Sequence, residues 1–144
     1  PPPAPGTAIV VDSNNANNDA AKARIDIAGW TSSSSTPGYY GSGYWYADTG
    51  TGSAATFNFY LPAAGTRTIE AWWTAGTNRT ASATFVAQNA SGAELGRQAV
   101  SQQTNGQRWV TVGTYAFSAG WNKVVLTRAG AAGKVVIADA IRVR

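Results

Sequence analysis

The sequence predicts an all-β protein, an antiparallel β-sandwich of the jelly-roll kind. Segments rich in β-branched and aromatic residues recur about every 8–12 residues, and clusters of Gly, Pro, Asn and Ser separate them. No segment carries a convincing helical pattern that could serve as a crossover between parallel strands. Many short strands without crossover helices pair in antiparallel fashion and stack as two sheets. We therefore expect a single sandwich domain.

Ten strands are predicted along the chain. In order, they are Ala8–Val11, Ile25–Trp30, Tyr44–Ala47, Ala55–Leu61, Arg67–Thr74, Ala81–Gln88, Leu95–Ser101, Trp109–Phe117, Asn122–Arg128 and Val135–Val143. Only Asp19–Ile27 is compatible with a helical turn, and the chain has no internal repeat.

Period-two alternation assigns one face of these strands to the core. In Ala55–Leu61 the inward set is Phe57, Phe59 and Leu61, and the outward set is Thr56, Asn58 and Tyr60. In the last strand the apolar row is Val135, Ile137, Ile141 and Val143, and Asp139 falls in the same row. A carboxylate in such a position must be hydrogen-bonded or paired.

The composition limits the chemistry that the chain can perform. It has no His and no Cys, which excludes Ser-His-Asp and Cys-His triads, disulfides, and metal centres ligated by imidazole or thiolate. Only seven Asp and Glu residues remain as acids or bases. We therefore expect a protein that is not an enzyme.

The charge of the chain favours an acidic partner, and its composition indicates a location outside the cell. The net charge of +4 comes from 11 Lys and Arg with no basic run, which argues against nucleic acid. No apolar stretch reaches the length of a membrane span, so no membrane partner is expected. Abundant Thr, Ser, Asn, Gly and aromatic residues with few charges are typical of secreted bacterial proteins.

The first residues are predicted to be a linker and the rest one module. Residues 1–6 are rich in proline and read as a stiff, extended connector, so 7–144 form the single β-sandwich domain. We expect a linked catalytic domain upstream of the linker and interpret Arg144, directly after the last strand, as the end of the protein. The module is expected to be a monomer.

Several motifs occur in an order that identifies a family. They are Gly29–Thr31, Pro37–Gly41, Tyr44–Ala47, Leu61–Gly65, Ala71–Trp73, Asn78–Arg79, Gln102–Gly106 and Val136–Arg142. Together, from about Ile9 to Val143, they resemble the C-terminal domain shared by golvesin and xanthan lyases. The resemblance implies a β-sandwich accessory module of bacterial extracellular enzymes, with carbohydrate binding as its role. It is similar, more distantly, to galactose-binding-like jelly rolls, some of which hold a structural calcium.

An aromatic segment after a Pro-Gly turn is the first candidate for sugar binding. Five aromatic residues lie within eight positions: Tyr39, Tyr40, Tyr44, Trp45 and Tyr46. Exposed rings can stack on the apolar faces of sugars, with a few polar groups to fix orientation. The alternative is that the rings plug the end of the sandwich or fill its core, which Tyr44 and Tyr46 favour most.

The remaining tryptophans divide between the core and the surface. Trp72 and Trp73 are adjacent in a strand, so they point to opposite faces. Trp73 is in phase with the core, whereas Trp72 is either exposed or covered by a loop. Trp109 and Trp121 each begin a strand beside a loop, where contact with a ligand is an option for both.

Polar loop residues complete the candidate site. Arg79, with Asn78 beside it, could hold the carboxylate of an acidic sugar, or could instead bond loop carbonyls or form a salt bridge. Gln103 and Asn105 could read sugar hydroxyls, or could belong to a solvated connector. The full set of candidates is Tyr39, Tyr40, Trp45, Trp72, Asn78, Arg79, Gln103, Asn105 and Trp109.

Two carboxylates are weak candidates for a structural calcium site. Asp12 ends the first strand and Asp139 lies in the last, and such strands are often neighbours in jelly rolls. Calcium needs six to eight oxygen ligands, and the spacing does not match an EF-hand loop. Alternatively, Asp139 accepts backbone amides or pairs with Arg24 or Arg79. No other cofactor is expected.

These observations favour a non-catalytic module that binds a polysaccharide. The net positive charge favours an anionic bacterial exopolysaccharide or a cell-wall glycan as ligand. A structural or adhesive domain that packs on its own catalytic domain, or on another protein, is the alternative, and it predicts a covered hydrophobic patch. An independent lyase that uses Tyr and Arg is disfavoured by the shortage of acids and bases.

Overall fold

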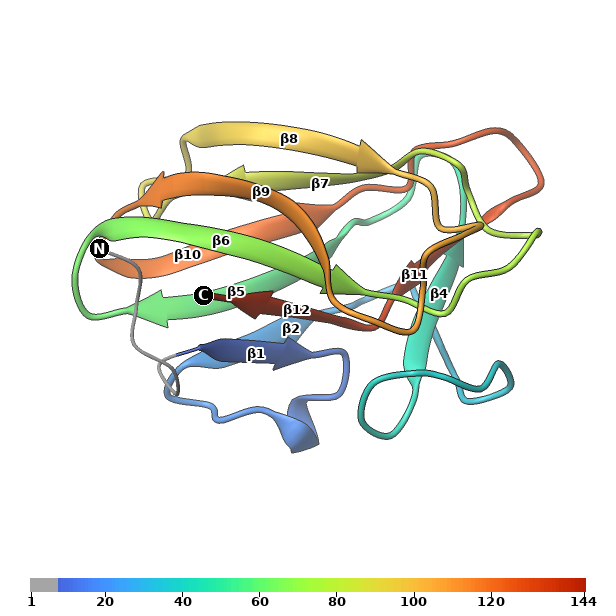
Figure 1. Ribbon diagram of the computed structural model, residues 1–144, viewed down its shortest axis with the longest axis horizontal. Helices are drawn as coiled ribbons and strands as arrows, with labels where there is room; N and C mark the ends of the chain where they lie inside the picture. Colours follow the sequence, from blue (N-terminus) through green and yellow to red (C-terminus); the bar gives the residue numbers. More distant parts are fainter. Residues whose placement is uncertain (1–7) are drawn as a thin grey trace.

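The computed structural model describes residues 8–144, which form β-strands and one short helix (Figure 1). The elements are β1 (Ile9–Asp12), η1 (Asn15–Asn17), β2 (Ala23–Asp26), β3 (Thr31–Ser33), β4 (Tyr44–Asp48), β5 (Ala55–Leu61), β6 (Gly65–Trp72), β7 (Ala83–Gln88), β8 (Glu94–Val100), β9 (Val110–Phe117), β10 (Gly120–Leu126), β11 (Val135–Ala138) and β12 (Ala140–Val143). The predicted linker, residues 1–6, lies outside the described part of the chain.

Two antiparallel sheets face each other and a third closes one end (Figure 1). The first sheet has the order β1-β12-β6-β9, the second β2-β5-β10-β7-β8, and the third β11-β4-β3. At the edges of the sandwich, β1 lies beside β2 and β8 lies beside β9. Almost every neighbour in a sheet is distant in sequence, as in a jelly roll. The predicted fold class is confirmed.

The core lies between the two large sheets, where the alternation of the sequence places it. Phe57, Phe59 and Leu61 are buried, and Phe59 packs edge-on against Phe117 with ring centroids 5.1 Å apart. Trp73 is also buried, as its phase predicts, and its indole nitrogen donates to a loop carbonyl. Burial of rings of this size supplies much of the free energy of folding.

The last predicted strand is in fact two strands that belong to different sheets. β11 pairs with β4, whereas β12 lies between β1 and β6, and the chain changes sheet at Asp139. The expectation of one continuous strand over Val135–Val143 is therefore wrong. The alternation stays in phase across the junction, and no Gly or Pro marks the break.

Other differences concern short elements near the beginning of the chain. Strand β3, in a serine-rich segment, is not among the predicted strands, and β2 ends at Asp26, well before the predicted end at Trp30. The helical turn allowed in Asp19–Ile27 is a single turn, in which the amides of Lys22 and Ala23 both donate to the Asp19 carbonyl at 2.8 Å. Within residues 8–144, no helix is long and apolar enough to cross a membrane.

Candidate functional site

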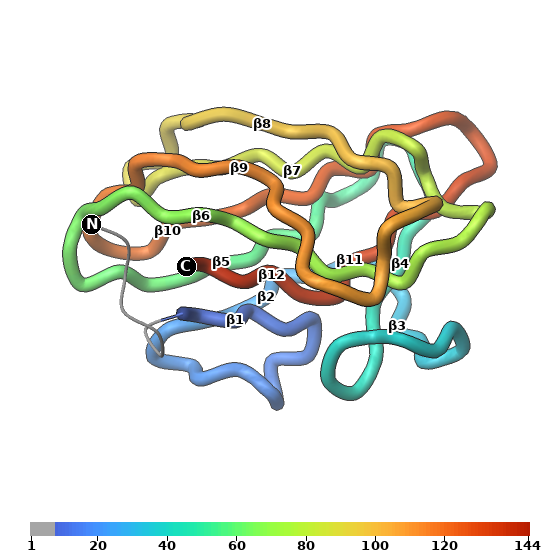
Figure 2. Tube along the Cα trace, viewed as in Figure 1, coloured from blue at the N-terminus to red at the C-terminus, as the bar shows by residue number. Residues whose placement is uncertain are grey.

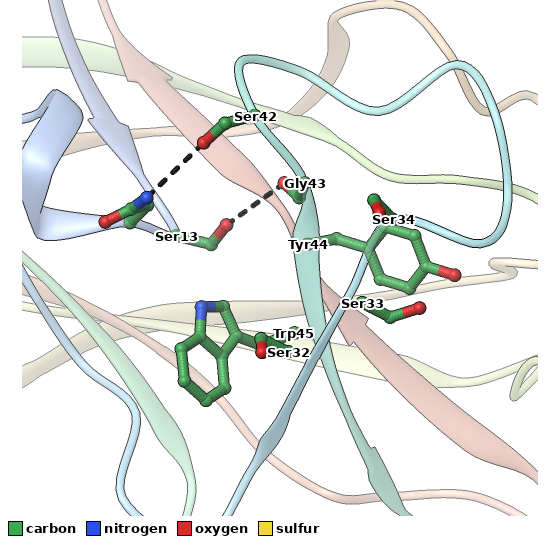
Figure 3. A pocket seen from close by; sticks show the side chains of 9 residues that line it. Ser13, Ser32, Ser33, Ser34, Ser42, Gly43, Tyr44 and Trp45 are labelled. Atoms are coloured by element: carbon green, nitrogen blue, oxygen red, sulfur yellow. Dashed lines mark hydrogen bonds between the residues drawn. The ribbon is translucent and has the colours of Figure 1, made fainter.

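An open groove of about 510 Å³ lies between the β3–β4 hairpin and the loop after β1 (Figure 3). It is lined by Ser13, Asn14, Ser32, Ser33, Ser34, Ser42, Gly43, Tyr44 and Trp45. Five of the nine are serines, and none of them carries a charge. The groove is therefore a neutral surface rich in hydroxyl groups, with aromatic rings at β4.

Pairing between β3 and β4 positions the groove residues. Ser32 lies opposite Trp45 and Ser33 opposite Tyr44, so each ring has a hydroxyl beside it. Adjacent residues of a strand point to opposite sides, and Figure 3 shows the Trp45 indole and the Tyr44 ring on either side of β4. Tyr44 is buried, whereas Trp45 is half-buried at the groove.

Hydrogen bonds fix the upper wall of the groove (Figure 3). The Ser13 hydroxyl donates to the Gly43 carbonyl at 3.3 Å, and the Asn14 side chain donates to the Ser42 hydroxyl at the same distance. Asn17 adds a second bond to Ser42, at 3.0 Å. A hydroxyl can both donate and accept, so each serine can turn toward a bound sugar.

The hydrogen bonds of the indole nitrogens distinguish tryptophans that hold loops in place from those that could donate to a ligand. Trp30, Trp72 and Trp73 each donate to a backbone carbonyl at 2.8–3.1 Å. Among the described residues, the indole nitrogen of Trp45 has no acceptor, nor do those of Trp109 and Trp121. Trp45 therefore offers a groove ligand both an apolar ring and a free donor.

Three predicted residues, Tyr40, Trp72 and Trp109, come together in one aromatic cluster. Their ring centroids are 5.1–5.6 Å apart, and the rings meet at steep angles of 57–74°. Trp72 donates its indole hydrogen to Gly38, and the Arg142 guanidinium lies 4.8 Å from the centre of the Trp109 ring. The loop before β4 thus folds onto the outer face of the first sheet, and its rings contact each other edge to face.

Arg79 holds loops together and leaves few donors for a ligand. The side chain is buried, and its nitrogens donate to the Thr74 carbonyl and hydroxyl, to Thr36 and to Asn78. Gln103 in turn donates to the Arg79 carbonyl at 2.9 Å. This arrangement matches the alternative in which Arg79 bonds loop carbonyls. It leaves no free guanidinium edge for the carboxylate of a sugar.

The other candidates lie in the same region with different exposure. Asn78 and Asn105 are exposed, and Asn105 adopts the left-handed conformation with φ of 59° and accepts a bond from Arg108. Tyr39 is half-buried against Tyr44, with ring centroids 6.4 Å apart. Three loops, over residues 34–43, 75–80 and 102–108, meet at this end of the sandwich (Figure 2).

Asp12 and Asp139 form a buried acidic pair beside the groove. The Asp139 carboxylate accepts the Tyr40 amide at 3.0 Å, while Asp12 accepts the Asn14 amide and the Asn17 side chain. One oxygen of each carboxylate, Oδ1, is buried with no hydrogen-bond partner among the described residues. Both side chains are at most 2% exposed.

Burial governs the ionisation of this pair. It raises the pKa of Asp139 to about 8; the Tyr40 amide opposes the rise, and the nearby charge of Asp12 adds to it. Burial also raises the pKa of Asp12, against hydrogen bonds from Asn17 and Asn14. Of the two alternatives for Asp139, pairing with Arg24 or Arg79 does not occur, because Arg24 bonds Asp26 and Arg79 bonds the loops. The backbone-amide alternative is confirmed.

The two unpartnered oxygens fit calcium in kind, since calcium prefers hard, anionic oxygens. They supply only two of the six to eight ligands that it needs. No group of three or more acidic, His or Cys side chains is close enough to hold a metal among residues 8–144. The remaining ligands would have to be carbonyls and water.

The groove serines were not predicted from the sequence, because a run of serines indicates a different kind of structure. A run of four serines, from Ser32 to Ser35, lies between Trp30 and the Pro-Gly turn. Such a run is typical of a connector, yet it holds a strand and one wall of the groove. The position of the run between Trp30 and the aromatic segment that begins at Tyr39 is the feature that could have indicated it.

Known proteins similar to this chain include bacterial polysaccharide lyases. Xanthan lyase of Bacillus sp. (strain GL1) is 35% identical over an alignment of 118 residues, and the match covers 78% of this chain and 12% of that protein. The structure of Paenibacillus xanthan lyase matches with a TM-score of 0.73 and 28% identity, over 95% of this chain and 13% of that one. The chain thus spans about an eighth of these relatives.

Isolated modules share the fold at lower identity. A family 35 carbohydrate binding module from Clostridium thermocellum has a TM-score of 0.62 at 14% identity, over 96% of this chain and 98% of that one. The Golvesin C-terminal domain family matches residues 9–144. The motifs and the sandwich they form are therefore those of this family, and the chain belongs to the Golvesin C-terminal domain family.

Proposed function

We propose that this protein is a non-catalytic carbohydrate-binding module whose sugar site is the serine-lined groove. One observation carries the proposal: Trp45, whose indole nitrogen is free, and the hydroxyls of Ser13 and Ser32 line the same neutral groove. An indole face stacks on the C–H surface of a sugar, while hydroxyls exchange hydrogen bonds with its own.

The relatives support a role in the recognition of polysaccharides outside the cell. The chain corresponds to a small part of xanthan lyases, and the modules that share its fold are named for carbohydrate binding. We infer that it is secreted by a bacterium as a monomeric module. It retains a linked enzyme or surface protein on an anionic exopolysaccharide or a cell-wall glycan, in keeping with its net charge of +4.

We also propose that Asp12 and Asp139 hold a structural calcium. The cation would neutralise two buried carboxylates and satisfy their unpartnered oxygens. It would fix the start of the loop after β1, and through the Tyr40 amide it would fix the loop before β4.

Affinity electrophoresis of the chain through gels that contain xanthan, alginate or peptidoglycan tests the sugar site. We expect at least one polymer to retard the wild-type chain, and Trp45→Ala to abolish the shift. Ser32→Val, an exposed change opposite Trp45, should weaken it without unfolding. Thr66→Ala, at an exposed position of β6, is the matched control. An unchanged shift in the folded Trp45 and Ser32 variants would refute the groove.

A further inference from the structure

The outer face of the second sheet carries a pair of rings that the groove does not explain. Tyr60 of β5 and Trp121 of β10 lie directly opposite each other, with ring centroids 5.7 Å apart. They are 38% and 40% exposed, and within residues 8–144 they are the only exposed large hydrophobic side chains. A lone exposed ring needs no explanation, but two side by side form an apolar patch.

A structural role accounts for this pair only in part. Cross-strand aromatic pairs stabilise a sheet, and exposed rings can supply this stabilisation. Trp121, however, offers its indole hydrogen to no acceptor among the described residues, unlike the tryptophans that hold loops. It therefore presents a ring and a donor to the solvent, as Trp45 does at the groove.

Positive charge borders the pair on two sides. Lys123 is two residues beyond Trp121 on the same face of β10, about 7 Å along the strand. Lys22 precedes β2, and its carbonyl accepts the Tyr60 amide at 2.9 Å, which places the two residues side by side on neighbouring strands. Both lysines are exposed, and neither forms a salt bridge within the described part of the chain.

The acids of this face do not cancel that charge. Asp26, on the neighbouring strand β2, is bonded to Arg24 at 3.3 Å and also accepts from Asn58. Asn58 lies opposite both Lys123 and Arg24 in the sheet and carries no charge. The row beside the rings therefore carries Arg24 and Lys123, and the acid at its far end, Glu94, is paired with Arg97 at 2.6 Å. The groove, in contrast, has no charged residue in its lining.

The two surfaces lie far apart on the molecule. The end of β5 and the beginning of β10 are at the left of Figures 1 and 2, and β3 and β4 are at the right, at the other end of the long axis. A single sugar cannot contact both. A long chain can, and simultaneous contact raises its apparent affinity above that of either site alone.

We propose that the Tyr60–Trp121 surface is a second glycan site, which takes an acidic polysaccharide segment and supplies the preference for anionic polymers that the neutral groove lacks. The rings contact the apolar face of the sugars, and Lys123 pairs with their carboxylates. The proposal rests on the proposed function only in that the ligand is a glycan, because the residues, the face and the charge are separate from those of the groove.

Binding of the chain to long alginate, to short alginate oligosaccharides and to uncharged dextran, measured by calorimetry, tests this site. For Trp121→Ala and Tyr60→Ala we expect affinity for long alginate to fall at least about tenfold, with unchanged binding of uncharged dextran in the groove. Lys123→Gln should weaken alginate binding and its dependence on salt while leaving binding to dextran as it was. Thr84→Ala, on the same face in β7, is the control.

The outcomes separate the two proposals. If the folded Trp121 and Lys123 variants bind long alginate as the wild type does, while Trp45→Ala abolishes binding, the second site is refuted and the groove stands. If Trp121→Ala weakens binding to dextran as much as binding to long and short alginate, the second site is also refuted, since one shared site would then account for both. If no glycan binds the wild-type chain at all, both proposals fail. A partner protein that requires Tyr60 and Trp121 would likewise overturn the second site.

Discussion

Replacement of Asp139 by Asn should change how the stability of the calcium-free protein depends on pH. The carboxyl of Asp139 is buried, and its pKa rises from 3.8 to about 8 in the folded chain. Between these values the folded protein holds a proton that the unfolded chain releases. The stabilisation from protonated Asp139 is therefore complete below about pH 4 and is lost as the pH rises through about 8.

The size of the effect follows from the same shift. Each pH unit in this interval lowers the free energy of unfolding by roughly 1.4 kcal/mol, so the whole interval corresponds to roughly 5–6 kcal/mol at most. Relaxation around the charged carboxylate reduces this, and we expect a loss of about 3 kcal/mol between pH 5 and pH 9. That is a large part of the stability of a typical domain.

Urea denaturation in the presence of a chelator, followed by the fluorescence of the six tryptophans, measures this loss. Asp139→Asn keeps an oxygen that can accept the Tyr40 amide and has no proton to lose near neutral pH. Its stability should therefore fall less steeply than that of the wild type from pH 5 to pH 9, because only the raised pKa of Asp12 still contributes, and should exceed that of the wild type at pH 9. A wild-type curve that is flat, or an equal slope in both proteins, would show that Asp139 does not ionise as its burial implies.

Three further results are expected. Excess calcium should raise the melting temperature of the wild type by several degrees, and Asp12→Asn should remove the rise. An identical melting temperature of the wild type with and without chelator would refute the calcium site. Trp72→Phe keeps an aromatic ring but loses the hydrogen bond to Gly38, so the free energy of unfolding in urea titrations should fall by about 1 kcal/mol. An unchanged free energy of unfolding would mean that water replaces this bond. Arg79→Lys removes the fork that bonds Thr74, and a loss of roughly 2–3 kcal/mol should follow, whereas a loss under 0.5 would contradict its role.

The fold could be predicted well where local pattern and burial agree. Strand β5 has the predicted bounds because its alternation sets Phe57 and Phe59 against exposed Tyr60. Strand β3 could not be predicted, because Ser32 and Ser33 have little preference for strands and pair only through their contact with β4. The break at Asp139 could not be predicted either, because it depends on which neighbours each half meets.

The candidate site was accessible from the sequence only as a list of ring-bearing residues. Adjacent Trp72 and Trp73 had to face opposite ways, and one is buried while the other is half-buried. That Tyr40 would cover Trp72 depends on the fold of a loop that is far from it in sequence. Exposure, which distinguishes Trp121 from Trp109, is a property of the assembled sandwich and not of either strand.

The position of β12 has a consequence for how the molecule is made. This strand comes last in the chain but lies in the middle of its sheet, and β1, the first strand, has no other partner there. As the chain emerges from a ribosome, β1 must wait for residues 140–143, more than 120 positions later, before its backbone is paired. Completion of the sandwich thus requires β12 to have been synthesised, and a nascent chain that stalls before Ala140 leaves β1 and β6 with open edges that favour aggregation.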